Sequence, residues 1–336
     1  MLVLRPYAKD AENGSFPSNK EIMAEIQVNE ESFYGKKVSI IGNKVTIDGQ
    51  VTKIDDSNDI SIVVNGDIEE LTFGYCDQLQ ISGNAGNIEA AYGDINIEGD
   101  IDGNVTIKKG SVNCRDINGE VKTKTGDIDC NNIGGNVTTE NGKVDCNDVS
   151  GDVKTTDGNV DCNDVGGNVT TEDGDIDCGN ISGDATTKTG NITCKEGDIE
   201  GDAKTESGYI DCCNVSGDVS TQSGNIVCDD VSGNVTTTTG DVDCDDVEGD
   251  VATESGSIDC GNVSGDVSIN GDAIEEITPE NDDDDEINTF DNTPTSTGHW
   301  EWYSIPCKKS NHTVFQTVRK PMASFFVCLT FYTKNI

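Results

Sequence analysis

A sixteen-residue unit is written roughly ten times into this chain of 336 residues, and it constrains the fold more than any other feature. A glycine opens each unit, and in the first ten units a second glycine follows seven residues later. A fixed short period is typical of repeat architectures, in which each unit stacks on its neighbours. The opening glycines stand at 103, 119, 135, 151, 167, 183, 201, 217, 233, 249 and 265. Four residues after the second glycine comes a cysteine, giving Cys114, Cys130, Cys146, Cys162, Cys178, Cys194, Cys212, Cys228, Cys244 and Cys260.

The spacing inside one unit predicts short strands and excludes helices. With Gly167 as position 1, apolar residues fall at positions 3, 10 and 15. Val169 and Thr171 share parity, as do Ile176 and Cys178, so each pair points to one face of a strand. The Gly- and Asx-rich steps between them are expected to supply corners with positive φ. We therefore predict an all-β fold, a single-stranded parallel β-helix (β-solenoid) with three short strands and about 16 residues per coil. Ten to twelve coils would make a rod of about 50–60 Å.

The repeat also divides the chain. We predict an irregular N-terminal segment over residues 1–36, a β-rich entry segment with degenerate coils over 37–102, and the regular β-solenoid over 103–273. An acidic linker (274–298) and an aromatic, basic tail (299–336) follow, the tail being expected to be poorly ordered. The step from Cys194 to Cys212 is two residues longer than the others, which predicts a bulged corner around 195–197 in an unbroken array.

Composition indicates which classes of partner and which cellular location to expect. The net charge is −42, and the repeat offers no basic stripe to neutralise phosphates, so nucleic acid is not an expected partner. No apolar stretch approaches the roughly 20 residues needed to span a bilayer. Fourteen cysteines without a recognisable secretory signal favour free thiols in a reducing compartment, with a cytoplasmic or virion-associated location.

Two columns of equivalent residues should fill the interior. Threonine has the parity of the buried valine, so we expect β-branched filling with hydroxyls bonded within the coil rather than an ice-binding array. The threonines are Thr123, Thr139, Thr155, Thr171, Thr187, Thr205, Thr221, Thr237 and Thr253. The cysteine column could serve as a metal or redox device, but lone thiols sixteen residues apart lack metal-site spacing, and buried, reduced filling is preferred. Cys213 should point outward and be the more oxidisable thiol.

Acidic columns should line the outside. Divalent cations would relieve the repulsion between stacked carboxylates, so weak Ca²⁺ sites are one interpretation of these columns. The alternative is a solvated face without bound ions. No other cofactor is expected. Position 11 carries Asp129, Asp145, Asp161, Asp177, Asp211, Asp243 and Asp259. Position 14 carries Asp148, Asp164, Asp230 and Asp246.

Catalysis finds little support in the residues, and we expect no enzyme. Both histidines, His299 and His312, lie in the tail. Phosphate-binding loops and nucleophile elbows are absent from the sequence. With 64 acidic residues, any pair of carboxylates resembling a general acid and base is expected by chance.

The segment Val-Ser-Gly-Asp-Val-Ser-Thr-Gln-Ser-Gly-Asn-Ile at 215–226 resembles the Gly-Asp-Val β-strand repeats of adhesin-type proteins in bacterial and phage genomes. The segments at 43–49 (Asn-Lys-Val-Thr-Ile-Asp-Gly) and 64–68 (Val-Asn-Gly-Asp-Ile) are similar to the opening of those proteins. The resemblance covers roughly residues 37–270. It implies a right-handed type of β-helix and carries over no enzymatic residues.

Three functions fit this pattern. The first is a non-enzymatic rigid scaffold or adhesion and interaction rod, whose protein or surface ligand is unknown. The second is an acidic rod that mimics duplex DNA and occupies a basic protein. The third is a filament subunit or homo-oligomer, because an uncapped terminal coil exposes unpaired strand edges.

Overall fold

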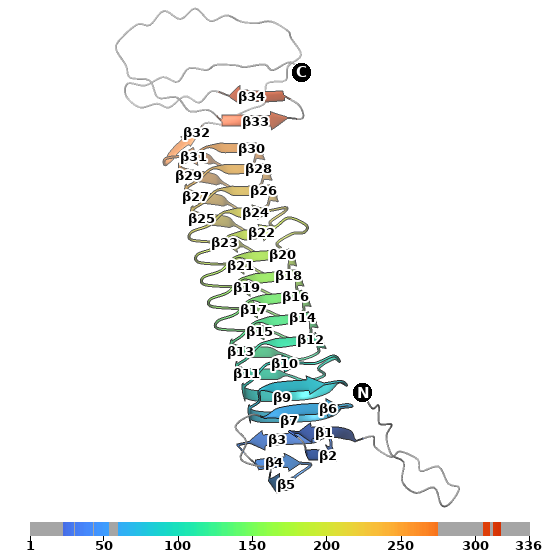
Figure 1. Ribbon diagram of the computed structural model, residues 1–336. Helices are drawn as coiled ribbons and strands as arrows, with labels where there is room; N and C mark the ends of the chain where they lie inside the picture. The colour runs from blue at the N-terminus through green and yellow to red at the C-terminus, as the bar shows by residue number, and fades with distance from the viewer. Residues whose placement is uncertain are drawn as a thin grey trace, which may run out of the picture.

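A computed structural model describes residues 23–29, 31–42, 44–53, 60–274, 305–309 and 312–316. These residues contain strands and no helix, and the chain winds into a β-solenoid of about 13 turns with roughly 16 residues per turn. Figure 1 shows the turns stacked into an elongated rod. The predicted fold class is confirmed, with slightly more turns than expected because stacking begins before the regular repeat.

One ladder of strands covers the first side of the rod. Successive members pair in parallel, and valine stands on valine, as in Val121↔Val137 and Val137↔Val153. The ladder consists of β7 (Ile68–Tyr75), β9 (Ala85–Tyr92), β11 (Val105–Lys109), β13 (Val121–Thr125), β15 (Val137–Thr138), β17 (Val153–Lys154), β19 (Val169–Thr170), β21 (Ala185–Thr186), β23 (Ala203–Lys204), β25 (Val219–Ser223), β27 (Val235–Thr239), β29 (Val251–Ser255) and β31 (Val267–Ile269).

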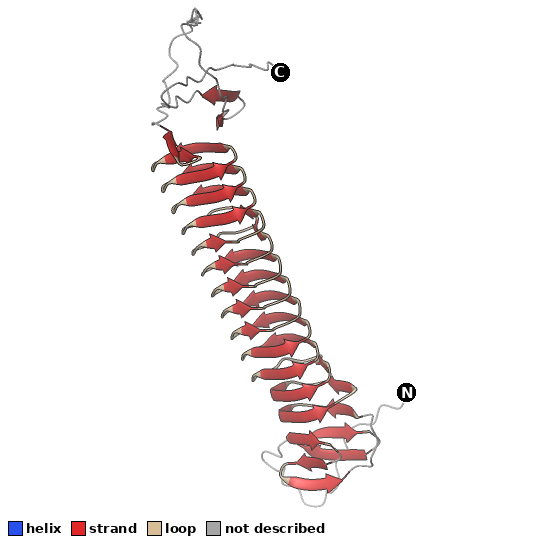
Figure 2. Cartoon of the chain, turned by 90° about the vertical axis from the view of Figure 1, so that its left-hand side faces the viewer, coloured by secondary structure: helices blue, strands red, loops and turns tan. Residues whose placement is uncertain are grey.

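A second parallel ladder carries the cysteines. Its register places cysteine on cysteine, as in Cys146↔Cys162. The ladder consists of β10 (Ile95–Asn96), β12 (Val112–Ile117), β14 (Ile128–Ile133), β16 (Val144–Val149), β18 (Val160–Val165), β20 (Ile176–Ile181), β22 (Ile192–Cys194), β24 (Ile210–Cys212), β26 (Ile226–Val231), β28 (Val242–Val247) and β30 (Ile258–Val263). Figure 2 shows the two ladders as opposite walls of each turn.

Each regular turn has two strands instead of the predicted three. In β14, Ile128, Cys130 and Ile133 are buried, while two consecutive exposed residues separate the last two of these. Strict alternation is therefore broken, and the strand bends so that position 15 faces the core from a third side. The third predicted strand is the bent end of the second one.

Close approach of the backbones, more than positive φ, explains the glycines. A Cβ on Gly158 would lie 2.0 Å from the carbonyl oxygen of Gly142 in the preceding turn. Five second glycines also have positive φ, between 144° and 159°, a range that L side chains rarely adopt. Among the described residues, the Asx residues with positive φ are Asn29, Asp48 and Asn270, and only Asn270, at the very end of the array, lies within 103–273. The predicted positive-φ corners are therefore supplied by glycines in the array, and only the Asx part of that prediction was wrong.

Antiparallel strands terminate the rod at both ends. β3 (Lys37–Ile41), β4 (Lys44–Ile47) and β5 (Gln50–Lys53) form a meander beyond β7. At the other end β32 (Asp272–Ile274) folds back on β31. Because antiparallel partners interrupt the parallel stack, they cap both ends of the rod.

The N-terminal segment contains a hairpin, so the prediction of irregular structure over 1–36 was wrong for its later part. β1 (Ala24–Val28) pairs antiparallel with β2 (Glu31–Gly35) and with β6 (Ser61–Asn65), which pairs in parallel with β8 (Gln78–Ile81). Ile26 and Val28 are fully buried, a period-two pattern that marks a strand. Residues 1–22 and the acidic linker from 275 lie outside the described residues. In the tail, β33 (Ile305–Lys309) and β34 (His312–Gln316) form an antiparallel pair.

The core consists of stacked columns, as predicted. Valine, isoleucine and cysteine of successive turns are buried along the whole regular array, and the threonines at position 5 are between 1% and 5% exposed. Burial loosens at the last turn, where Cys260, Val263, Val267 and Ile269 are partly exposed.

Candidate functional site

The position-11 aspartates form one outward column on the cysteine ladder. Strand register places Asp129, Asp145, Asp161 and Asp177 on successive turns, and Asp243 next to Asp259. Neighbouring turns are about 4.8 Å apart, so adjacent carboxylates repel. The side chains are exposed, with Asp211 and Asp259 half-exposed. The column is interrupted twice, at Thr193 and at Val227.

Two lysines relieve part of this repulsion. Lys143 Nζ lies 2.7 Å from Asp145 Oδ2 and 3.1 Å from Asp161 Oδ2, so one ammonium group bridges two turns. Lys195 Nζ lies 2.7 Å from Asp211 Oδ2. The hydrogen bonds to these carboxylates raise the pKa of both lysines. The acidic column therefore binds ammonium groups supplied by the chain itself.

Calcium coordination by the column stays a prediction. Ca²⁺ takes six to eight oxygen ligands, a number that needs several carboxylates converging on one point. Within the described part of the chain, no group of three or more His, Cys, Asp or Glu side chains is arranged to hold a metal ion.

The position-14 residues have a structural role that the sequence reasoning missed. Asp164 Oδ1 accepts hydrogen bonds from the backbone N–H of Asn180 (3.2 Å) and from its Nδ2 (2.8 Å). Asp246 does the same for Asn262, at 3.2 and 2.7 Å. These side chains satisfy backbone donors of the next turn at a corner, where the strand ladders leave them unpaired.

Two further Asx ladders run along the other corners. At position 2, Asn168 Oδ1 accepts from the backbone N–H of Asp184 (2.8 Å), and Asp184 Oδ1 accepts in turn from Asp202 (2.9 Å). At position 9, Asp175 Oδ1 accepts from Asn191, and Asn191 Oδ1 from Tyr209. The signal was present in the sequence: Asn and Asp predominate at these positions and share one acceptor oxygen, and the exceptions at position 9 of the first ten units are Ser111, Lys143, Tyr209 and Ser257.

The threonine column faces inward, as predicted, but its hydrogen bonds differ from the expectation. The Oγ1 atoms donate to the carbonyl of a glycine in the preceding turn, for example Thr187 to Gly174 (3.0 Å) and Thr237 to Gly224 (3.1 Å). The bonds therefore join turns. Thr139 Oγ1 and Thr155 Oγ1 are buried without a hydrogen-bond partner.

The cysteine column is buried from Cys114 to Cys244, and these thiols form no disulfide. Cys114 Sγ and Cys130 Sγ lie 3.2 Å apart. Hydrogen bonding to Cys114, together with burial, raises the pKa of Cys130, so this thiol is protonated and unreactive at neutral pH. Burial raises the pKa of Cys194 to about 12. These properties match small apolar filling.

The bulge at 195–197 is confirmed, and Cys213 of the next turn contacts it. The array continues through it, because Ile192 pairs with Ile210 and Cys194 with Cys212. Cys213 is half-buried instead of fully outward, and its Sγ lies 3.0 Å from the Lys195 carbonyl oxygen. Partial burial and nearby carboxylates raise its pKa. Its greater tendency to oxidise stays a prediction.

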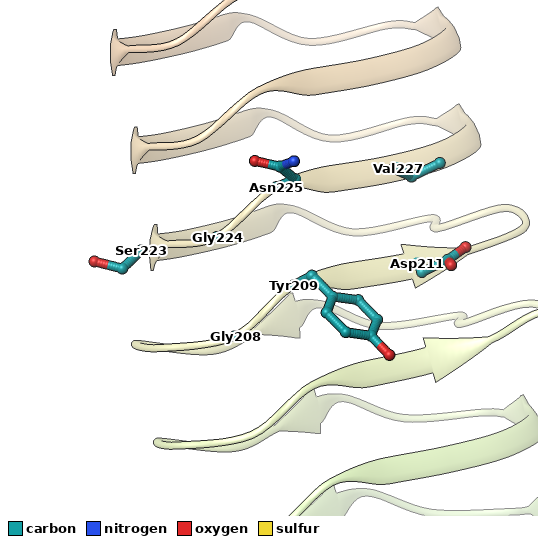
Figure 3. Close-up of a pocket in the computed structure, with 7 residues that line it drawn as sticks. All are labelled: Gly208, Tyr209, Asp211, Ser223, Gly224, Asn225 and Val227. Carbon is teal, nitrogen blue, oxygen red and sulfur yellow. The ribbon is translucent and has the colours of Figure 1, made fainter.

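A shallow pocket lies beside this bulge, and the sequence reasoning did not find it. Figure 3 shows its lining on two successive turns: Gly208, Tyr209, Asp211, Ser223, Gly224, Asn225 and Val227. Tyr209 is 45% exposed and Val227 43% exposed. The available signal was a tyrosine at position 9 and a valine at position 11, where the other regular turns carry polar residues.

The fold and its columns define the chain as a β-solenoid repeat protein. Comparison with protein-family models, curated proteins and solved structures found no significant match. The resemblance to adhesin-type repeats therefore stays a prediction. None of the described residues forms a helix long and apolar enough to cross a bilayer.

Proposed function

We propose that this protein is a non-enzymatic rigid scaffold whose outer faces bind partners, an interaction or adhesion rod. The supporting observation is the contrast between inward and outward positions of the same strands. Position 3 is occupied by Val121, Val137 and Val153, all buried, whereas position 4 beside them alternates between Lys122, Thr138 and Lys154. Interior columns are fixed by packing, which leaves the outward residues free to vary for recognition.

Rigidity follows from the stacking. Each turn bonds to the turns above and below through both strand ladders and through the Asx side chains at the corners. Turns of this kind cannot slide without breaking several hydrogen bonds together, so the rod keeps outward groups at fixed spacings of about 4.8 Å. A scaffold or an adhesion device needs this property, because a partner that reads several turns requires a defined spacing.

The proposal is tested by shape and capture together. Small-angle scattering of the full chain should give an elongated particle of at least about 60 Å, from 13 turns at the strand spacing. Affinity capture on the immobilised chain should yield a partner that is lost when Lys122, Lys154 and Lys204 are changed to threonine, the residue found at this position in other turns. A compact particle, or capture of nothing together with turnover of a substrate, contradicts the proposal.

The DNA-mimic and filament alternatives stay predictions that no observation here favours. Competition with duplex DNA for a basic protein, abolished by Asp→Asn changes along position 11, tests the first. Sedimentation of the full chain at rising concentration tests the second.

A further inference from the structure

The Tyr209–Val227 pocket, defined by the seven lining residues above, contains two residues that differ from the repeat pattern and that stacking of the turns does not require. Tyr209 donates its backbone N–H to Asn191 Oδ1 (3.1 Å) as the position-9 ladder requires. Its ring offers no acceptor oxygen at the corner, so the ladder is interrupted before the next turn and resumes where Asn225 accepts from Asp241 (2.9 Å). A residue that gives up a repeated stabilising contact and exposes an aromatic ring indicates selection for something other than stability.

Val227 is a second departure, and it adjoins the first. Its neighbours above and below in the register are Asp243 and Asp211. The valine therefore exposes an apolar surface between two carboxylates, each about 4.8 Å away along the rod. In Figure 3 the Tyr209 ring projects from the same turn as Asp211, one turn below Val227. A tyrosine, a valine and one carboxylate, that of Asp211, thus line a single pocket, with the ring directed toward the turn below and the valine on the turn above.

This combination specifies a long cationic side chain. A guanidinium or ammonium group is attracted to the face of a tyrosine ring, and its aliphatic stem prefers apolar surface such as that of Val227. The Asp211 carboxylate in the lining, and that of Asp243 one turn above Val227, complement its charge. Lys195 already shows the chemistry at the rim, because its ammonium group lies on Asp211. The net charge of −42 adds long-range attraction for a basic partner and repels an acidic one.

We propose that the Tyr209–Val227 pocket binds an arginine or lysine side chain presented by a basic segment of a protein partner. The inference rests on the proposed function of an interaction rod and names one site on it. Arginine suits the pocket better, because its planar guanidinium stacks on the ring while donating to the carboxylates. Lys195 of the bulge pairs with Asp211 of the lining, so a partner bound in the pocket would be recognised at one defined height of an otherwise repetitive rod.

The test uses the full chain and a fluorescein-labelled nonapeptide with three arginines spaced by glycine and serine. Anisotropy is measured at about 0.15 M salt, where interactions between distant exposed charges are screened. Tyr209→Asn and Val227→Asp introduce residues that equivalent positions already carry, so both variants keep the fold, which circular dichroism checks. Thr193→Asp fills the other interruption of the same column and is the matched control.

The pocket and the general acidity of the rod predict opposite signs. If the pocket binds the peptide, Tyr209→Asn weakens binding about two- to fivefold. Val227→Asp also weakens it about twofold or more, although it adds a carboxylate, while Thr193→Asp leaves binding unchanged or tightens it. Binding that Val227→Asp leaves unchanged or tightens overturns the proposal.

Two further probes separate the other occupants. A peptide with citrulline in place of arginine should bind at least threefold more weakly, and equal binding overturns the proposal. Maltoheptaose is tested as a neutral saccharide. If Tyr209→Asn abolishes maltoheptaose binding but leaves the affinity for the arginine peptide unchanged, the pocket binds a saccharide and the proposal fails. Either failure leaves the rod intact, because its shape is measured separately by scattering.

Discussion

Two threonines at equivalent positions provide a sharp test of what holds the turns together. Thr139 and Thr171 are both 2% exposed and sit in the same interior column. Thr171 Oγ1 lies 3.2 Å from the Gly158 carbonyl oxygen, whereas Thr139 Oγ1 has no hydrogen-bond partner. Valine has nearly the same shape and the same preference for strands, so Thr→Val isolates the hydroxyl.

The magnitudes follow from these two environments. A buried hydroxyl without a partner costs about 1–3 kcal/mol, so Thr139→Val should stabilise the chain by about 1–2 kcal/mol. At Thr171 the same change removes a hydrogen bond whose net contribution is about 1 kcal/mol, so the result should lie between no change and a loss of about 1 kcal/mol. The free energies of unfolding of the two variants should therefore differ by at least about 1 kcal/mol, with Thr139→Val the more stable.

Urea unfolding followed by circular dichroism measures this difference. Because a stack of turns need not unfold in one step, hydrogen exchange at the amides of the neighbouring turns should accompany it. Thr155→Val is a replicate of Thr139→Val, since Thr155 Oγ1 is also without a partner. Equal shifts for the bonded and unbonded threonines would refute the view that these hydroxyls join adjacent turns.

Four further experiments probe other contacts. Gly158→Ala places a Cβ 2.0 Å from a carbonyl oxygen of the preceding turn and should lower the free energy of unfolding by about 3 kcal/mol or more. A Cβ on Gly74 meets nothing closer than 4.0 Å, so Gly74→Ala is the control and should change stability by at most about 1 kcal/mol in the same urea assay. Asn168→Ala removes the acceptor for an N–H of the next turn and should lower stability by about 1 kcal/mol, while Asn168→Asp, which keeps the acceptor, should restore most of it. The folded-state pKa of Cys194 is raised to about 12 from 9.0. The buried neutral thiol therefore contributes its full stability below about pH 9, and this contribution is lost as the pH rises towards 12. Urea unfolding midpoints measured from about pH 8 to 11 should fall accordingly. Iodoacetamide labelling with mass spectrometry should modify Cys213 before Cys194 in the folded chain, and equal rates would contradict the burial argument.

The interior was predictable because it is periodic. A period of sixteen residues fixes which residues stack, and parity then decides which of them face inward. That argument placed the valine, isoleucine, threonine and cysteine columns correctly, and it anticipated the bulge before Cys212. It overcounted strands, because parity alone does not reveal that two consecutive outward residues, such as Asn131 and Asn132, bend one strand around a corner.

The corners were less predictable, because Asn and Asp have two physical uses there. In isolated turns they tolerate positive φ and bond to their own backbone, which was the expectation. In a stack, the next turn offers an unpaired N–H at the same corner about 4.8 Å away, and the side-chain oxygen accepts from it, as Asp152 does from Asn168. Sequence period and residue type are the same in both cases. The difference is the neighbouring turn, a contact that local propensity does not contain.

In a repetitive chain, recognition sites can be sought at residues whose type the stacking of turns does not explain. At a ladder position, any residue that keeps the acceptor oxygen is explained by stacking, and so is any apolar residue at an inward position. Tyr209 and Val227 satisfy neither condition, although each occupies a position whose role is defined by the other turns. In a solenoid the informative positions are therefore the departures from the repeat that stacking does not require, and here two of them meet in one pocket.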